Sequence, residues 1–187
     1  MAISLRPMTA EDLPGIDLWL RLPHVARWWT PDTTAEAELA KYRRRIGPDA
    51  LTDTIMLTVL QDSRPIGWCQ WYRWASYPDD EAAMGARDGE AGMDYAIGDP
   101  AWIGRGAGTE LIAVLVHEIR RQHPGAGMLV GPDAANTPSR RVLEKNGFEL
   151  VEIRPVATEP TDAPIAIYRL PGAHAETGSY ARRADVR

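Results

Sequence analysis

Residues 92–109 read GMDYAIGDPAWIGRGAGT, and this stretch joins a short alternating segment to a glycine-rich turn. In the alternating segment, Met93, Tyr95 and Ile97 fall on one face of an extended chain, whereas Asp94 falls on the other. The pattern predicts a β-strand that carries a carboxylate on its more polar face.

The glycine-rich turn leads directly into a predicted helix. Gly104, Gly106 and Gly108 are spaced two apart and precede residues 109–122, TELIAVLVHEIRRQ, whose apolar spacing predicts a buried amphipathic helix. Glycines let a backbone approach a ligand closely, and the free N–H groups at a helix start can bind a pyrophosphate. Arg105 adds a cation to the same turn. This strand-turn-helix unit therefore indicates a site for a diphosphate group.

Two common phosphate-binding loops do not fit this turn. The P-loop requires Lys followed by Ser or Thr after its last glycine, but Gly108 is followed by Thr109 and Glu110. The dinucleotide fingerprint requires its last glycine three residues beyond the second, where this chain has Thr109. That fingerprint also usually opens its domain, whereas this turn comes in the middle of the chain.

The rest of the chain predicts an α/β (α+β) fold. Strands are expected at residues 2–7, 54–60, 66–74, 128–130, 148–154 and 165–170, with an antiparallel hairpin at 54–74. Helices are expected after Thr9 and Asp12, at 24–29, at 35–46 behind Thr33 and Thr34, and at 137–146. Residues 76–91, SYPDDEAAMGARDGEA, lack periodicity and predict a long loop.

Composition restricts the class of protein. A chain of 187 residues with 44% hydrophobic residues suits one globular domain, expected at residues 1–170, with a flexible tail at 171–187. No apolar run is long enough to span a membrane and no signal sequence is evident, so a cytoplasmic location is expected. One cysteine and four histidines give no metal-ligand cluster. The net charge of -5 argues against a nucleic-acid partner and permits a cationic one.

A second motif, DAANTPSRRVLEKNGFEL at residues 133–150, supports the interpretation of the glycine turn as a diphosphate site. Together the two motifs resemble the GNAT acyltransferase superfamily over about residues 3–170. The resemblance implies the GNAT fold, in which a mixed, mostly antiparallel central sheet splays between its fourth and fifth strands and is flanked by helices. It also implies that acetyl-CoA (CoA) lies in that splay.

The resemblance carries a set of cofactor contacts onto this chain. The family binds pyrophosphate through the turn's backbone amides and the pantetheine arm through an asparagine, here Asn136. The family's usual Gln or Arg at the head of the turn is Ile103 here, so one side-chain contact is missing. The cofactor-binding residues expected on this basis are Tyr95, Ala96, Ile97, Ile103, Gly104, Arg105, Gly106, Ala107, Gly108, Thr109, Asn136 and Ser139.

A narrower resemblance is to the aminoglycoside 6'-N-acetyltransferases. This resemblance rests on four segments: the tandem Trp28 and Trp29, IGWCQWYRW at 66–74, the acid-rich predicted loop at 76–91, and residues 92–109. Those enzymes hold the target amine with an aspartate on the fourth strand, which matches Asp94 and implies a role in antibiotic resistance.

The chemistry of a carboxylate also favours Asp94 as the catalytic residue. A carboxylate attracts a protonated amine and can take its proton, but an aspartate with a pKa of about 3.9 is a poor acceptor unless burial raises that pKa. The alternative is that Asp94 is an ordinary solvated strand residue.

The acceptor is expected to be a cationic small-molecule amine. Residues 77–99 contain seven acids and a single base, a surplus that favours capture of a polycation. For each loop acid, a role in solubility alone is the alternative. The expected substrate-binding residues are Trp28, Trp29, Gln70, Tyr72, Asp79, Asp80, Asp94 and Asp133.

One departure from the family leaves other functions open. Many GNAT enzymes protonate the departing CoA thiolate with a tyrosine, and the matching residue here is Leu143, so Ser139 or water would substitute. A siderophore-precursor (hydroxy)lysine N-acyltransferase is one alternative, although that branch usually has histidine where this chain has Asp94. A non-catalytic acyl-CoA-binding or sensing module is another. Either a monomer or a homodimer is compatible with the sequence.

Overall fold

The computed structural model describes residues 2–29, 34–47, 50, 53–158 and 162–172. Thr33 and all but the first two residues of the expected tail at 171–187 lie outside these ranges. Within them, no helix is long and apolar enough to cross a membrane.

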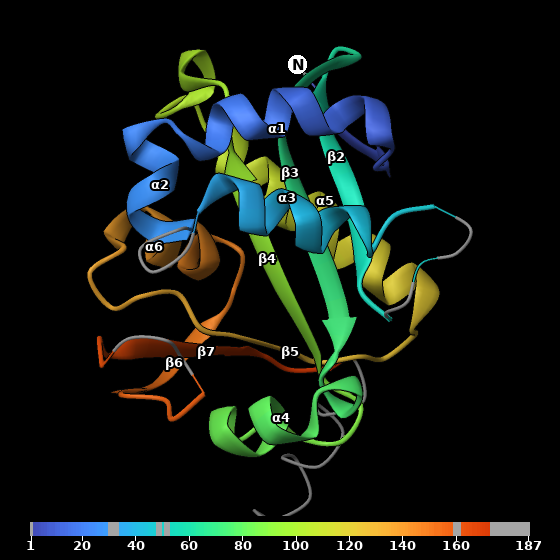
Figure 1. Ribbon diagram of the computed structural model, residues 1–187. Coiled ribbons are helices and arrows are strands. Elements are labelled where there is room, and N and C mark those ends of the chain that lie inside the picture. Colours follow the sequence, from blue (N-terminus) through green and yellow to red (C-terminus); the bar gives the residue numbers. More distant parts are fainter. Residues whose placement is uncertain (1, 30–33, 48–49, 51–52, 159–161, 173–187) are drawn as a thin grey trace, which may run out of the picture.

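One seven-stranded sheet runs through the described chain in the order β1-β2-β3-β4-β5-β7-β6 (Figure 1). Every neighbouring pair is antiparallel apart from β4 and β5, which are parallel. The expected mixed, mostly antiparallel sheet is therefore confirmed. The strands are β1 Ile3–Pro7, β2 Ile55–Gln61, β3 Arg64–Arg73, β4 Ala91–Ile97, β5 Met128–Val130, β6 Glu149–Arg154 and β7 Ile165–Leu170.

Helices cover both faces of this sheet. Figure 1 shows α1 and α3 crossing the near face of β2 to β4, with α2 to their left and α5 behind the same strands. The α-helices are α1 Leu13–Leu20, α2 Pro23–Trp29, α3 Ala35–Arg43, α4 Pro78–Met84, α5 Ala107–Gln122 and α6 Thr137–Lys145. Short 3₁₀ turns lie at η1 Ala10–Asp12, η2 Trp74–Ser76 and η3 Pro100–Trp102.

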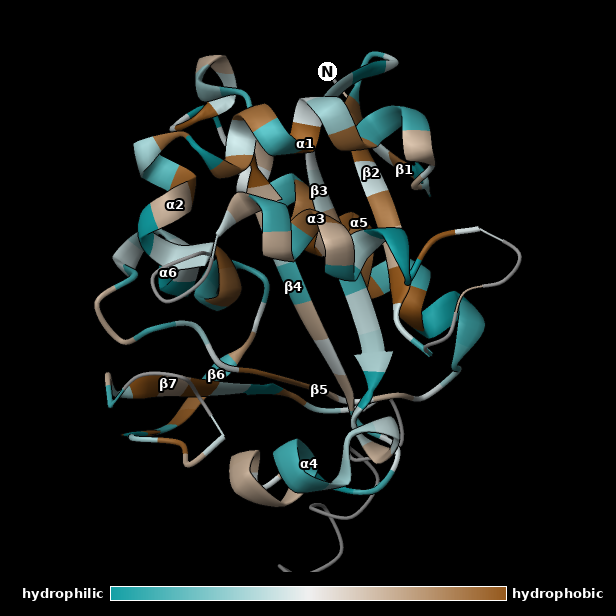
Figure 2. Cartoon of the chain, viewed as in Figure 1, coloured by the Kyte–Doolittle hydropathy of each residue, from teal (hydrophilic) through white to brown (hydrophobic). Residues whose placement is uncertain are grey.

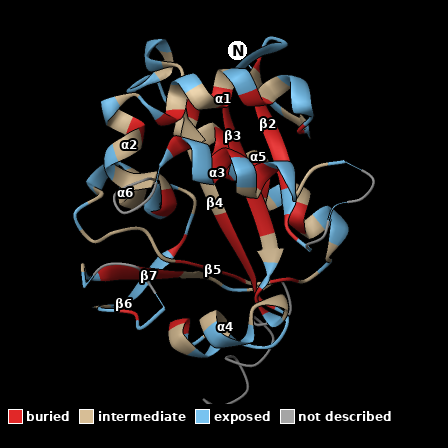
Figure 3. Cartoon of the chain, in the orientation of Figure 1, coloured by how far each residue is buried: buried red, intermediate tan, exposed pale blue. Residues whose placement is uncertain are grey.

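Strand β3 separates two hydrophobic cores because its side chains alternate between the faces of the sheet. Cys69 and Trp71 pack in a cluster with the buried face of α5, whereas Trp68 packs in a second cluster with α1 and α3. Figure 2 shows hydrophobic residues along β2 and β7, and Figure 3 shows that β2 and β3 are largely buried while α1 and α3 keep an exposed side. The sheet is thus fixed from both sides.

The predicted β-hairpin is confirmed. Asp62 and Ser63 take positive φ angles of 48° and 68° in the turn, so strands β2 and β3 are joined directly. Gly67 lies in β3 opposite Ile97 of β4, where a β-carbon would stand 2.2 Å from the carbonyl oxygen of Ala96. The absence of a side chain therefore lets the third and fourth strands pair closely.

The prediction of a long loop at residues 76–91 was wrong, because α4 forms within it. Pro78 occupies the first turn of α4, and Asp79, Asp80 and Glu81 are the acids of that turn. Acidic side chains stabilise the positive end of a helix, and proline tolerates a first-turn position. Gly85, at φ 71°, then ends the helix in a left-handed conformation. The acids are helix-start residues and not components of an irregular loop.

Other helix bounds differ by a few residues from those expected. Helix α3 ends at Arg43 and not at residue 46, and α5 begins at Ala107 and not at Thr109. Thr34 caps α3 as expected, since its hydroxyl oxygen accepts a hydrogen bond from the Ala37 amide at 3.2 Å.

Replacement of Gly67 by alanine tests the close pairing of β3 and β4. Because the new β-carbon would overlap backbone atoms of β4, Gly67→Ala is expected to lower the free energy of unfolding by about 1–3 kcal/mol. Urea denaturation measures this change. Gly15→Ala is the matched control, because nothing lies within 4 Å of its β-carbon in α1 and alanine favours helices. Equal stability of the two variants would contradict the assigned contact.

Candidate active site

A cavity of about 910 Å³ opens beside the middle of the sheet. Its walls come from β4, from α2 and α3 on one side, and from the start of α5 and the start of α6 on the other. Cavities that hold cofactors and substrates commonly span about 300–1,000 Å³. The cavity is therefore large enough for a substantial ligand.

This cavity exists because β4 and β5 separate. The two strands are paired at a single position, Ala91 opposite Met128, where the Ala91 amide donates to the Gly127 carbonyl oxygen at 2.9 Å. Beyond Ala91 the cavity borders β4, and Met93 through Ile97 all line it. The expected splay between the fourth and fifth strands is confirmed.

The parted edge of β4 offers backbone groups to a ligand. The Gly98 amide, next to the end of β4, donates to the Ile66 carbonyl oxygen on the β3 side at 2.8 Å, whereas the Ala91 amide at the start of β4 points the other way, to the Gly127 carbonyl oxygen. Because amide direction alternates along a strand, the amides of Tyr95 and Ile97 face the cavity instead. In agreement, the Ile97 carbonyl oxygen lies 3.2 Å from Nε2 of His24, another residue of the cavity wall.

The glycine turn places the start of α5 at the cavity. Gly104 and Gly106 have φ angles of 74° and 88°, a backbone conformation that favours glycine. The first hydrogen bond of α5 runs from the Glu110 amide to the Gly106 carbonyl oxygen. The amides of the three preceding positions, 107–109, have no acceptor among the residues that the structure describes. Such a helix start binds anions, so the turn suits a diphosphate.

Asp94 stands on the opposite wall of the cavity from the side chain of Tyr95. It lies directly across from Gln70 in the β3–β4 ladder and accepts a hydrogen bond at Oδ2 from Gln70 Nε2, at 2.7 Å. Gln70 Oε1 in turn accepts from Nη1 of Arg45 at 2.9 Å. Asp94 is thus the end of a three-residue chain of hydrogen bonds.

The environment of Asp94 raises its pKa above the ordinary value of an aspartate. Desolvation is the largest cause, and it outweighs the hydrogen bond from Gln70 and the positive charges of Lys41 and Arg45, which lower the pKa. The negative charge of Glu38 also raises it. Burial therefore raises the pKa of Asp94, and this is the condition under which an aspartate can accept a proton from an amine.

Tyr95 and Ser139 form a hydroxyl pair on the other side of β4. Tyr95 Oη lies 2.7 Å from Ser139 Oγ of α6, and both residues line the cavity. Desolvation raises the pKa of Tyr95, so its hydroxyl keeps its proton at neutral pH. The amide of Ser139 donates to Asn136 Oδ1 at 3.2 Å, which caps α6. A proton-bearing hydroxyl therefore faces the cavity opposite the carboxylate.

The model of one protein family, described as an acetyltransferase (GNAT) domain, matches residues 8–154. The chain belongs to the GNAT acetyltransferase family. Its curated relatives include aminoglycoside N(6')-acetyltransferases type 1 from Klebsiella pneumoniae and Serratia marcescens. Each is 27% identical over 150 residues, which cover 79% of this chain and 74% of the relative.

Solved structures share the GNAT fold of this chain. The structure of AAC(6')-Ib with ribostamycin and coenzyme A has a TM-score of 0.77 and 24% identity, and each chain is covered completely. The same enzyme with coenzyme A and kanamycin has a TM-score of 0.68 and 25% identity, with 91% of this chain and 95% of that chain covered. The overall arrangement of strands and helices is therefore common to these proteins.

Most residues expected at the GNAT site lie around one cavity, but some do not. Those that line it are Trp28, Trp29, Gln70, Asp94, Tyr95, Ala96, Ile97, Ile103, Gly104, Gly106, Gly108, Thr109, Asp133, Asn136 and Ser139. Arg105 and Ala107 belong to the turn without lining the cavity. Tyr72 packs its ring against Trp74 and Tyr77, and Asp79 and Asp80 lie in α4, so these three side chains are outside it.

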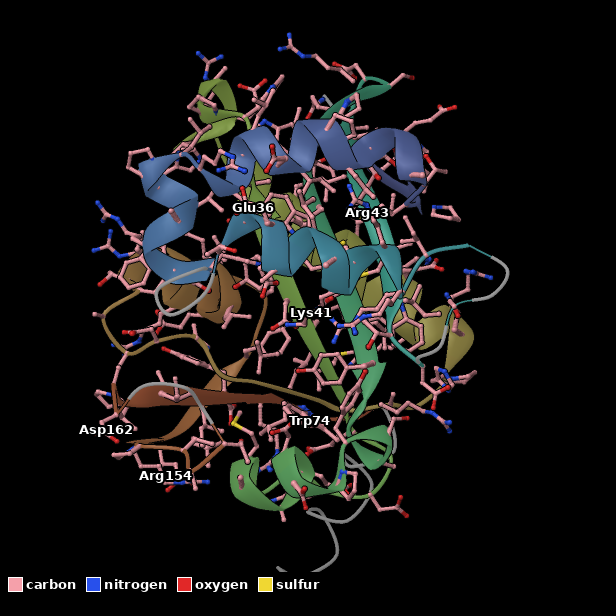
Figure 4. The ribbon with its side chains drawn as sticks, in the orientation of Figure 1. Glu36, Lys41, Arg43, Trp74, Arg154 and Asp162 are labelled. Atoms are coloured by element: carbon pink, nitrogen blue, oxygen red, sulfur yellow. The ribbon has the colours of Figure 1, made fainter. Side chains whose placement is uncertain are left out.

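Several cavity residues were missed by the sequence analysis. Glu38 and Lys41 project from α3, which looked only like a charged surface helix. Figure 4 shows Lys41 on the side of α3 nearest β4. No local signal in the sequence marked these two residues, because the packing of α3 on the sheet is what brings them to the cavity. Other missed residues that line the cavity include His24, Arg27, Trp102, Arg141 and Lys145.

Among the described residues, no group of three or more His, Cys, Asp or Glu side chains is placed to hold a metal ion. Cys69 is fully buried, and desolvation raises the pKa of its thiol. The side chains lining the cavity that can move protons include carboxylates, hydroxyls, amines and the imidazole of His24.

The raised pKa of Asp94 is open to direct measurement. In protein labelled with ¹³C at aspartate carboxyls, the resonance of Asp94, assigned by its loss in Asp94→Asn, is expected to titrate with a midpoint above about 3.9. The cause is the desolvation of the carboxylate in the cavity wall. A midpoint at or below 3.9 would show that hydrogen bonding and nearby cations dominate instead.

Proposed function

We propose that this protein is an acetyl-CoA-dependent N-acetyltransferase that acetylates a primary amine of a cationic small molecule. The first candidate for the acceptor is the 6'-amine of an aminoglycoside, which would make the protein a resistance enzyme. The observation that carries the proposal is the partly buried Asp94 carboxylate at the parted edge of β4. The curated aminoglycoside acetyltransferases named above support the choice of acceptor.

The side of the cavity formed by α5 and α6 fits a CoA-type donor. The free amides at the start of α5 suit its diphosphate, and Arg141 and Lys145, one turn apart on α6, add positive charge to the same wall. The parted edge of β4 offers the amides of Tyr95 and Ile97 to a chain lying along it. When bound, acetyl-CoA supplies the acetyl group as an activated thioester.

Asp94 is suited to handle the amine. Its carboxylate attracts a protonated amine, orients it, and holds the proton that the nitrogen loses before attack. A pKa raised by burial makes this carboxylate a better proton acceptor than an exposed aspartate. The cavity-facing amides of β4 can stabilise the negative charge that develops on the carbonyl oxygen.

Tyr95 and Ser139 are suited to serve the leaving group. The residue at the usual tyrosine position, Leu143, is fully buried in the core and does not line the cavity. The Tyr95 hydroxyl lies across β4 from Asp94, is paired with Ser139 Oγ and keeps its proton at neutral pH. We therefore assign proton donation on the thiolate side to this pair.

A second candidate acceptor is favoured by the cations of the cavity. Lys41 and Arg27 stand in the wall formed by α2 and α3, while the acids Asp79 and Asp80 lie outside it. Glu38 of the same wall lies 3.6 Å from Lys41, but the two cations outnumber that acid, and a surplus of positive charge beside Asp94 suits an acceptor that carries an anionic group as well as an amine. A lysine or hydroxylysine derivative, such as a siderophore precursor, has this chemistry.

The catalytic domain is assigned to residues 1–170. The family match covers residues 8–154, and β7, which completes the sheet, ends at Leu170. The proposed chemistry uses no residue beyond Leu170.

An acceptor panel tests the function. Release of CoA from acetyl-CoA is measured with kanamycin, with hydroxylysine and without an acceptor. Turnover with kanamycin is expected, and Asp94→Asn is expected to lower kcat/KM by about 10²–10⁴-fold because the proton acceptor is lost. Asp88→Asn, at an exposed position outside the cavity lining, is the charge-matched control.

Each outcome of the panel selects one function. Turnover with hydroxylysine alone selects the second candidate. CoA binding without turnover of any amine selects the non-catalytic module. Full activity of Asp94→Asn would remove the assigned role of the carboxylate.

The diphosphate site is tested by a pair of glycine variants. Gly106→Ala forces a side chain onto a φ of 88° at the start of α5, so it should turn the free amides away and weaken CoA binding by about 10-fold. Calorimetric titration with CoA measures the affinity. Gly89→Ala, at a φ of 78° with open space around it and away from the cavity, has the same backbone strain and should keep normal affinity. Equal affinities in both variants would argue against this site.

A further inference from the structure

Arg45 connects the end of α3 to the middle of β3. It follows the last turn of α3, and its amide donates to the Tyr42 carbonyl oxygen at 2.9 Å. Tyr42 is almost fully buried in the core beneath α1 and α3, and Ile46 packs against the same core. The backbone on both sides of Arg45 is therefore held in place, and its guanidinium reaches Gln70 Oε1 at 2.9 Å.

The contact with Arg45 decides which end of the Gln70 amide faces Asp94. In the observed orientation, Gln70 Oε1 faces the guanidinium donors and Gln70 Nε2 faces the carboxylate. The flipped amide would direct its NH₂ group at Arg45, which has only donors, and its oxygen at Asp94, which has only acceptors when ionised. Gln70 is buried, so both mismatches would be costly. Only one orientation satisfies all three residues.

We propose that Arg45 is a positioning residue for the transfer reaction, which holds the Gln70 amide so that its NH₂ group fixes the Asp94 carboxylate toward the cavity. This inference rests on the proposed role of Asp94 as the residue that handles the amine. The expectation that Gln70 also binds substrate stays a prediction, because Gln70 lines the cavity and its amide has one further donor and one further acceptor site.

The proposed arrangement leaves one carboxylate oxygen for the acceptor. The bond from Gln70 is made to Oδ2 of Asp94, and no hydrogen bond to Oδ1 occurs within the described part of the chain. A single strong hydrogen bond on Oδ2 limits rotation of the carboxylate, since the other oxygen then has a fixed direction. Pre-organisation of this kind favours attack because the amine is held in one geometry.

Several charged groups act on Asp94 together with Arg45. Lys41 and Arg45 lower its pKa from the α3 side, and Glu38 of the same helix raises it. His24 and Asp133 line the same cavity from α2 and from the segment after β5. Loss of Arg45 removes a nearby cation and also frees the Gln70 amide, so both effects move the pKa of Asp94 upward.

The test compares Arg45→Gln with Arg44→Gln. Arg44 is the adjacent, exposed arginine and has no side-chain contact with the site, so its variant loses the same charge without the contact. Arg45→Gln is expected to lower kcat about 5- to 10-fold with little change in KM, and to move the acid limb of kcat/KM upward by about 0.5 pH unit. Arg44→Gln should match the wild type, and Arg45→Lys should recover part of the loss.

A double-mutant cycle shows whether Arg45 acts through Gln70. In a Gln70→Leu background the amide is absent, so Arg45→Gln should have a clearly smaller effect on kcat than it has in the wild type. An equal effect in both backgrounds would overturn the inference. So would a pH profile of Arg45→Gln that coincides with that of Arg44→Gln.

A measurement without substrate separates this inference from the proposed function. The ¹³C titration of Asp94 should shift upward in Arg45→Gln and stay unchanged in Arg44→Gln, whether or not any amine is acetylated. If the wild type acetylates no amine but the shift is seen, the function fails and the positioning contact stands. If the wild type is active and neither the titration nor kcat responds to Arg45, the inference is wrong. Thermal unfolding confirms that each variant is folded at the assay temperature.

Discussion

The parting of β4 from β5 is the constraint on which the other features of the site depend. A single paired position, Ala91 with Met128, holds the two parallel strands together, and the cavity occupies the space beyond it. Backbone amides that a continuous sheet would use internally are thereby turned toward a ligand. The same separation lets the start of α5 and the start of α6 face the strand edge. Without it, neither the glycine turn nor Asp94 would border a shared space.

The sequence predicted the parts of this arrangement that depend on local chemistry. The glycine turn and the strand carrying Asp94 were recognisable because positive φ angles, free amides and period-two alternation are properties of short segments. Local features of this kind can be predicted from the sequence, because their conformation does not depend on contacts with distant residues. Asn136, in contrast, was identified through the family resemblance as a contact of the pantetheine arm, and the structure adds that its side chain caps α6.

The features that the sequence did not predict depend on tertiary packing. Helix α4 was missed because its seven residues are too few for an apolar period, although Pro78 and Gly85 mark its ends. Glu38, Lys41 and Arg45 reach the site only because α3 packs across β3 and β4, a placement that no local pattern encodes. Asp79 and Asp80 look like substrate contacts in the sequence since they lie near Asp94 along the chain, yet the turn of α4 directs them elsewhere.

The indole cluster beneath the cavity wall has a practical consequence. Trp19 and Trp68 stack with ring centroids 6.1 Å apart and planes within 3°, and Trp29 meets Trp68 edge-on at 5.0 Å. Trp29 lines the cavity and also donates its indole N–H to the Tyr42 hydroxyl. Excitation energy can therefore pass among three closely spaced chromophores, of which one lines the cavity. The protein carries its own fluorescent reporter of occupancy, without any attached dye.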